Sequence, residues 1–312
     1  MGEVITDKDK EYEKMEREGS ASADITLRTS IRMSDEAMSD RVNNRSLRPR
    51  SEAFKEFMTT GWDDNEPQIE PLESSKYTPA RLEALGKAFP GERIVIPAGQ
   101  PKVRNNDCDY AFRPDTTFSY YTGLGEDFEA GAVLVLNPVD PDSPEAKAGK
   151  THVPELFVAP RANHYTQDFF MNAHYGEYWV GPRAGVKEMT AMTGIETNDI
   201  AQLPDALSKD VGTEAGAVRV RVIREADPAI TSMVEEIREA NGFADPDNNT
   251  AADDKLHEFA AEARMVKDGY EINEMRKAVD ATKHGFDRLL SALPAALDKP
   301  RSERILEGAF NA

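Results

Sequence analysis

The chain has 312 residues, which is room for one large domain or two ordinary ones; 39% of the residues are hydrophobic, and the formal net charge is −19. This acidity disfavours nucleic acid and anionic membranes as partners, because both select surfaces rich in lysine and arginine. The single cysteine, Cys108, excludes an intrachain disulfide and a cysteine-cluster zinc site. No apolar run reaches the roughly 20 residues that a membrane span needs. These features predict a cytoplasmic protein.

Two segments of low hydrophobicity come first. Residues 1–50 carry many charges and few large apolar side chains, so burial cannot offset the entropy lost on ordering. We expect a disordered arm there. Residues 51–75 are expected to form a short helix with Phe54 and Phe57 on one face, followed by a linker rich in Asp, Glu and Pro.

Helical and strand patterns alternate over residues 76–243, which predicts an α/β domain with a mixed or parallel sheet. Thr78 and Pro79 are typical of a helix start, and Pro90-Gly91 of its end. Short β-branched runs predict strands at 93–97, 132–136, 155–159 and 218–223. Apolar spacing predicts helices at 166–171, 186–192, 199–208 and 230–240.

The C-terminal part is helical in pattern. Residues 243–250 are rich in turn formers and are expected to form a joint, and Asp298-Lys299-Pro300 interrupts the helices that follow. A last helix is expected from Ser302, with unpartnered apolar residues between Ile305 and Phe310. We therefore expect residues 251–312 to be the start of a second, incomplete domain.

Metal-binding motifs are only partly formed. His257-Glu258 resembles the start of an HExxH zinc motif, but Ala261 stands where the second histidine is required. Residues 245–250 resemble the start of a calcium loop without its glycine, and a turn before a helix explains them better. Asp254 and Glu258 share a helix face, as do Glu258 and Glu262, and with His257 beside them they could hold at most a weak, mononuclear surface site.

The densest pattern lies in residues 104–126, where charges of both signs alternate among tyrosines and phenylalanines. Charged pairs next to an aromatic cluster favour buried or interface ion pairs over a solvated face. An ordinary core strand and turn with local ion pairs is the alternative interpretation. Either way, Arg104, Asp107 and Arg113 are expected to be structural or interface charges, not catalytic groups.

A family resemblance rests on these residues. The string Arg104-Asn105-x-Asp107-x-x-Tyr110-x-Phe112-Arg113, followed by residues 118–123, resembles the N-terminal domain of aminopeptidase P, the Xaa-Pro aminopeptidases. Further blocks agree in order: the strands at 132–136 and 155–158, then the segment from Trp179 through Arg183 to Gly185. Residues 264–278 resemble the helix that opens the catalytic domain of that family.

The resemblance implies a mixed-sheet N-terminal domain of the aminopeptidase P/creatinase type, followed by the first helices of a truncated pita-bread domain. It implies a metalloaminopeptidase with two manganese ions that acts on peptides with proline at position two, and a homo-oligomer. The family's metal ligands lie beyond the part that this chain resembles, so we expect no bound metal and no catalytic residue here. Structural or interface roles are implied for Arg104, Asn105, Asp107, Tyr110, Arg113, Trp179 and Arg183.

Two other interpretations stay open. The chain could be a stand-alone, non-catalytic domain for interaction or oligomerisation, or the front part of a prolidase or creatinase relative. The apolar residues between Ile305 and Phe310 argue against a stand-alone domain, which should bury or replace them.

Overall fold

The structure is a computed structural model that describes residues 52–63, 69–106, 108–126, 128 and 130–312. The arm expected at residues 1–50, and Asp107, lie outside these residues. The chain divides into two compact units, Met1–Ala261 and Glu262–Ala312.

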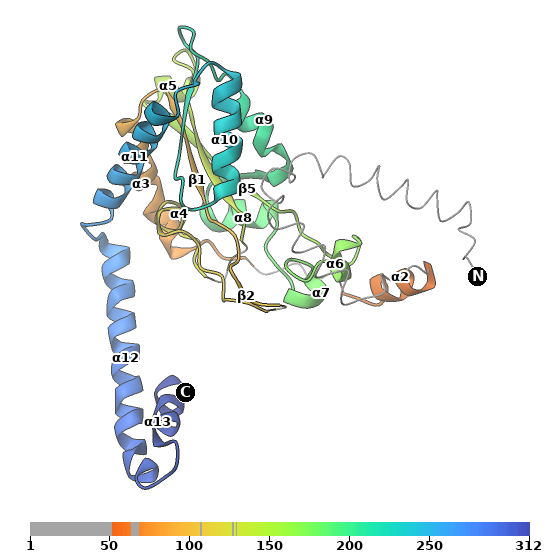
Figure 1. The fold of residues 1–312 in the computed structure, drawn as a ribbon, viewed down its shortest axis with the longest axis vertical. Helices are drawn as coiled ribbons and strands as arrows, with labels where there is room; N and C mark the ends of the chain where they lie inside the picture. The colour runs from red at the N-terminus through yellow and green to blue at the C-terminus, as the bar shows by residue number, and fades with distance from the viewer. Residues whose placement is uncertain (1–51, 64–68, 107, 127, 129) are drawn as a thin grey trace. The chain divides into compact units, whose positions relative to one another are not determined.

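A five-stranded mixed sheet forms the centre of the first unit (Figure 1), with the strand order β6-β5-β4-β1-β7. The strands are β1 (Glu92–Pro97), β4 (Val133–Pro138), β5 (His152–Val158), β6 (Glu196–Asp199) and β7 (Arg219–Val222). β4 is antiparallel to both β1 and β5, whereas β7 runs parallel to β1 and β6 parallel to β5. The α/β class with a mixed sheet is confirmed.

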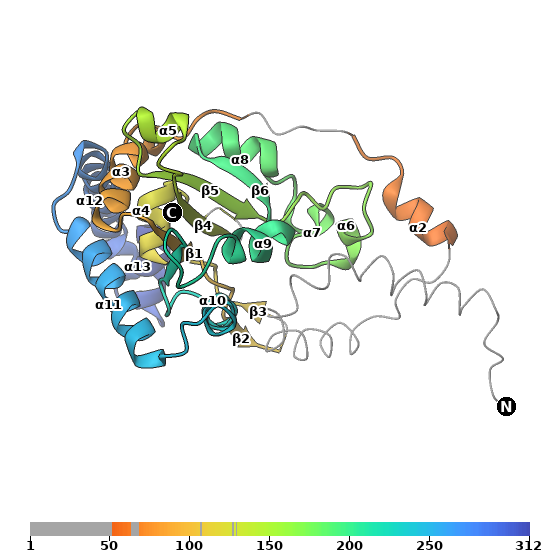
Figure 2. The same ribbon diagram turned by 90° about the horizontal axis from the view of Figure 1, so that it is seen from above.

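The strands supply two hydrophobic cores because neighbouring side chains point to opposite faces of the sheet. On β4, Leu134 and Leu136 belong to one core, and Val133 and Val135 to the other. The first core is covered by α3 (Thr78–Ala88), α4 (Thr116–Thr122), α8 (Val186–Thr193) and α11 (Pro246–Ala263). The second is covered by α9 (Leu203–Ser208) and α10 (Pro228–Ala240). Figure 2 shows the sheet between these helices.

Shorter elements complete the first unit. β2 (Val103–Asn105) and β3 (Cys108–Asp109) pair as an antiparallel ribbon. The remaining helices and 3₁₀ turns are α2 (Glu52–Thr59), η1 (Glu73–Lys76), α5 (Pro144–Lys147), α6 (Asp168–Met171), α7 (Glu177–Val180) and η2 (Ile200–Gln202).

Helix α4 replaces the core strand and turn that its composition suggested. The Asp115 side chain accepts a hydrogen bond from the backbone N–H of Thr117 at 2.8 Å, which caps the first turn. Gly123 ends the helix with φ of 77°, and a Cβ there would lie 2.1 Å from the Ser74 hydroxyl oxygen. Both ends are therefore fixed for a helix, and the capping overrides the strand preference of the aromatic residues between them.

Helix α11 begins within the segment expected to be a turn-rich joint. Pro246 opens it, and the Asp245 side chain accepts from the backbone N–H of Asn248 at 3.2 Å. Leu256 and Ala260 are fully buried in the first core. By packing, the helix up to Ala261 belongs with the first unit, whereas the sequence suggested that the second domain starts at residue 251.

The second unit consists of α12 (Gly269–Ala296) and α13 (Ser302–Asn311), with the expected interruption between them. α13 lies alongside the C-terminal half of α12 (Figure 1), where the Phe286 and Phe310 rings meet edge to face at 5.2 Å. Gly285 permits this contact, because a Cβ there would lie 2.8 Å from the Phe310 ring. The two helices leave several large apolar side chains exposed: Ile272, Met275, Val279, Phe286, Leu290, Leu293, Leu297 and Ile305.

Candidate functional site

The first group of motif residues lies on and beside the β2–β3 ribbon. Arg104 and Asn105 are exposed on β2, and the Tyr110 side chain is 60% exposed just after β3. The Arg113 guanidinium lies 3.8 Å from the Glu126 carboxylate, and both side chains are largely in solvent. A pair this exposed contributes little stability. Arg104, Arg113 and Glu126 therefore lie at the surface, whereas Asp109 and Asp115 are half-buried.

The second group lies on the segment that contains α6 and α7. The Arg161 Nε and Nη2 atoms donate to the two carboxylate oxygens of Glu177 at 2.7 and 3.0 Å. Arg183 is buried, and its Nη1 lies 3.4 Å from the carbonyl oxygens of Pro160 and Tyr175. Two arginines thus hold the backbone of this segment in place, one by a bidentate ion pair and one through carbonyl groups.

Trp179 lies on the segment that Arg161 and Arg183 hold in place. Its indole Nε1 donates to the Phe170 carbonyl oxygen at 2.8 Å, yet the side chain is 58% exposed. Nearby, the Tyr175 hydroxyl donates to Asp168 at 3.3 Å. Burial, and then the Asp168 carboxylate, raise the pKa of Tyr175 to about 12, so its phenol stays neutral and keeps donating.

The two groups of motif residues approach each other. The His174 Nδ1 atom lies 3.6 Å from an Asp109 carboxylate oxygen, which links the segment of α6 and α7 to β3. Exposed aromatic side chains continue from there toward α2, where Trp62 meets Phe169 at 5.1 Å and Tyr178 at 5.8 Å, both edge to face. We refer to the exposed residues Tyr110, Trp62, Tyr165, Tyr178 and Trp179 as the aromatic surface.

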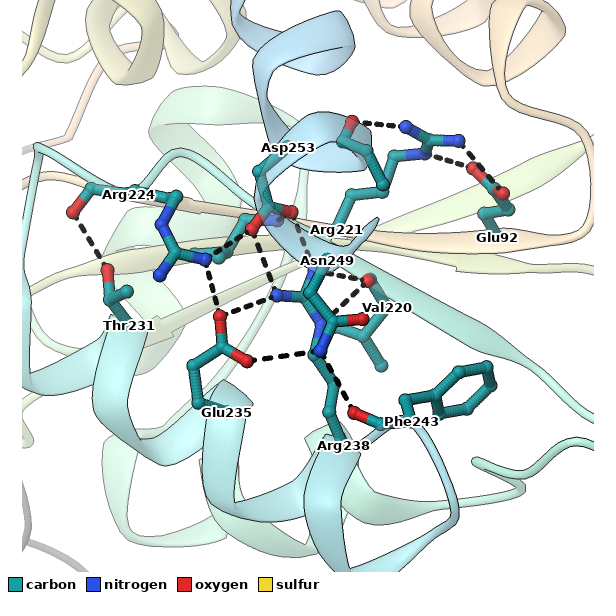
Figure 3. Close-up of polar contacts among 12 residues, drawn as sticks. Glu92, Val220, Arg221, Arg224, Thr231, Glu235, Arg238, Phe243, Asn249 and Asp253 are labelled. Carbon is teal, nitrogen blue, oxygen red and sulfur yellow. Dashed lines mark hydrogen bonds and ion pairs between the residues drawn. The ribbon is translucent and has the colours of Figure 1, made fainter. Parts of the chain in front are cut away.

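A buried charge network lies beside β7, the strand at the other edge of the sheet from β6 (Figure 3). It was not predicted from the sequence. Arg238 and Asp253 are only 2% and 1% exposed, and they pair at 2.6 and 2.9 Å. Asp253 also accepts from Arg224 at 2.8 Å and from the backbone N–H of Val222 at 2.9 Å. These four hydrogen bonds, two to each carboxylate oxygen, leave neither oxygen of the buried side chain without a partner.

The network joins α11 to β7 and α10. Arg238 also donates to the Val220 carbonyl oxygen at 3.2 and 2.7 Å, and Glu235 accepts from both Arg224 and Arg238. A signal for it exists in the sequence. Arg238 follows Ile230 and Val234 at four-residue spacing, which places it on the buried face of its helix.

The described residues offer no metal centre. Among them, no group of three His, Cys, Asp or Glu side chains is placed to hold a metal ion. Asp254, His257 and Glu258 are exposed on α11. The two-metal site that the family resemblance implies therefore does not fit these residues. No helix in the same part of the chain is long and apolar enough to cross a membrane.

Comparison with known proteins gives consistent matches. Residues 79–218 match the family model described as aminopeptidase P, N-terminal domain. The chain is 36% identical over 262 residues to Xaa-Pro aminopeptidase 1 of Streptomyces coelicolor, covering 83% of this chain and 47% of that protein. It is 33% identical over 274 residues to Xaa-Pro aminopeptidase 2 of the same organism, covering 88% and 52%.

A solved structure shares the fold. Aminopeptidase P from E. coli superposes with a TM-score of 0.53 at 21% identity, covering 78% of this chain and 50% of that chain. The matched residues define an aminopeptidase P N-terminal domain within the first unit, and they include all strands of the mixed sheet except β7. The chain belongs to the Xaa-Pro aminopeptidase family, and the resemblance noted in the sequence is confirmed. It spans about half the length of the curated relatives it matches.

Proposed function

We propose that this chain is the N-terminal portion of a Xaa-Pro metalloaminopeptidase, which releases the residue that precedes a penultimate proline. The observation that carries the proposal is the 36% identity to Xaa-Pro aminopeptidase 1 over 262 residues. The proposed metal is manganese, with two ions per active site. Because the described residues offer no ligand set for them, the 312-residue chain is expected to be inactive alone and to bind manganese weakly if at all.

A chimera tests the proposed activity. The chain is joined to the C-terminal half of Xaa-Pro aminopeptidase 1 of Streptomyces coelicolor, and both the chimera and the chain alone are assayed with manganese. We expect the chimera to release alanine from Ala-Pro-Ala but not from Ala-Ala-Ala, and the chain alone to release it from neither.

Each other outcome contradicts a specific part of the proposal. A folded chimera that is inactive on both peptides contradicts the family activity, and equal cleavage of both contradicts the proline requirement. Metal-dependent release by the chain alone, or binding of two manganese equivalents in a calorimetric titration, contradicts the proposal that the active site lies outside it.

We further propose that the exposed motif residues, with Tyr110 and Trp179 at their centre, form an interface between two copies of the chain. What supports this is the aromatic surface: exposed Tyr110 and Trp179 lie on segments that are tied together through Asp109 and His174. Tyrosine and tryptophan are enriched at protein interfaces. A corresponding interface role for Asp107, which lies outside the described residues, remains a prediction.

Sedimentation velocity tests this interface. Replacing both residues, Tyr110→Asp and Trp179→Asp, should convert a homo-oligomer into a monomer with an unchanged circular dichroism spectrum. Met265→Asp, at another exposed apolar position, is the control and should leave the assembly intact. A wild-type chain that sediments as a monomer at every concentration contradicts this proposal, as does a double variant that still assembles.

A further inference from the structure

A small cavity lies beside the buried charge network, between β7 and α11. It has a volume of about 170 Å³ and lies wholly within the first unit. Its charged lining residues are Glu92, Arg219, Arg221, Arg238 and Lys255. Figure 3 shows three of them, Glu92, Arg221 and Arg238, around the start of α11. Four cations and one carboxylate therefore line one cavity in a chain of net charge −19.

Two of these cations are neutralised locally. Arg238 pairs with Asp253, and Arg221 forms a bidentate ion pair with Glu92. The side chains of Arg219 and Lys255 form no ion pair or hydrogen bond with any other residue that the structure describes. The Arg219 guanidinium instead lies 5.8 Å from the Phe243 ring. The cavity thus has two positive charges in excess, one from β7 and one from α11.

Several N–H groups of the side chains that line the cavity also have no acceptor among the described residues. Arg238 uses all five of its N–H groups on Val220, Glu235 and Asp253. Arg221 uses three of its five, two on Glu92 and one on the Ala252 carbonyl oxygen. The residues that line the cavity therefore keep N–H donors without an acceptor in the described part of the chain: two on Arg221, five on Arg219 and three on the Lys255 ammonium. These are the donors that bind an oxyanion most strongly.

We propose that this cavity binds a small oxyanion of the phosphate class. A dianion neutralises the two excess charges, and the guanidinium groups can donate to two of its oxygens at once. A cavity of about 170 Å³ is many times the roughly 10–15 Å³ of probe volume that one water molecule requires, so an inorganic phosphate with some of its hydration shell fits in it. Bound between Arg219 and Lys255, the anion adds a further connection between β7 and α11.

Titration of the complete chain with inorganic phosphate tests the site, with chloride at equal ionic strength as the reference. We expect saturable binding by calorimetry and a melting temperature that rises with phosphate but not with chloride. Arg219→Gln and Lys255→Gln should each weaken phosphate binding by about tenfold or more, because each removes a charge-assisted hydrogen bond. Arg219→Lys should retain most of the affinity.

A matched control removes the same charge elsewhere. Lys147→Gln with Lys187→Gln, both at exposed positions, should leave phosphate binding unchanged. The absence of saturable binding at tens of millimolar phosphate overturns the proposal. It is also overturned if the Arg219→Gln/Lys255→Gln double variant, shown to be folded by circular dichroism, binds as tightly as the control.

Discussion

The Asp253 carboxylate receives four hydrogen bonds in a place almost without solvent. Asp253→Asn removes the negative charge that faces Arg238 and Arg224 while keeping the size of the side chain. Removing one partner of a buried ion pair leaves the other charge uncompensated. We expect the free energy of unfolding to fall by about 3 kcal/mol, measured by urea denaturation.

Asp254→Asn is the matched control, because the neighbouring carboxylate is exposed on the same helix. It should change the free energy of unfolding by less than about 0.5 kcal/mol. Equal effects of the two substitutions would show that overall charge, and not the buried pair, determines the stability.

His152 gives the stability a pH dependence. Its Nε2 lies 2.8 Å from the Glu92 carbonyl oxygen, and burial lowers the pKa of the imidazole below its ordinary value. The unfolded chain therefore binds a proton at this residue more readily than the folded chain does. The free energy of unfolding should decrease as the pH falls below about 6.5, and this loss should reverse as the pH is raised.

Urea denaturation across this pH range measures the effect. His152→Gln should flatten the pH dependence near neutrality, whereas His257→Gln, at an exposed position, should leave it as in the wild type. An unchanged pH profile in His152→Gln would assign the effect to another group.

Among the elements, α4 ends at a glycine whose backbone conformation and surroundings both exclude a side chain. Gly123 has φ of 77°, and Ser74 fills the space where a Cβ would lie. Gly123→Ala should therefore lower the free energy of unfolding by at least about 1–2 kcal/mol, because an L side chain strains this conformation. Gly125→Ala, where a Cβ meets open space, is the control for thermal denaturation and should have a much smaller effect.

The elements differ in how far the sequence specifies them. β1, β4, β5 and β7 are apolar or alternating runs, and their patterns predicted them. β6 was not predicted, because its residues Glu196–Asp199 are polar and become a strand only by pairing with β5. The start of α11 was placed too late, because Asp245 and Pro246 are equally typical of a turn and of a helix start.

The candidate site shows the same division. Arg104, Tyr110 and Trp179 stand out in local motifs within short segments, and their interface role stays a prediction. The Arg238–Asp253 pair could not, since its partners come from two helices that meet only after the core has packed. Periodicity indicated that Arg238 faces inward, but not which carboxylate it meets.

At the scale of the whole molecule, the first unit should fold without the second. A chain ending at Ala263 retains α11, with Leu256 and Ala260 in the core and Asp253 in its network. It should melt within a few degrees of the full chain. A chain ending at Gly242 loses all of these contacts and leaves Arg238 without its carboxylate partner, so it should be much less stable.

Circular dichroism melting of the two shortened chains measures this difference. Equal stability of the two would show that α11 does not stabilise the first unit. If the chain ending at Ala263 fails to fold, the first unit requires α12 and α13. The sequence placed a joint at residues 243–250 and the second domain from residue 251, because turn formers after Gly242 occupy the first turn of a helix whose packing partners lie far away in the chain.

β7 is an edge strand, and its bonding has a consequence for aggregation. The Val220 carbonyl and the Val222 N–H would pair with a neighbouring strand, and Arg238 and Asp253 bond to them instead. An open edge is a template for strands of other molecules. Two oppositely charged side chains thus occupy the backbone groups that a sixth strand would bond. The ion pair that holds α11 on the sheet therefore also hinders pairing of β7 with a strand of another molecule.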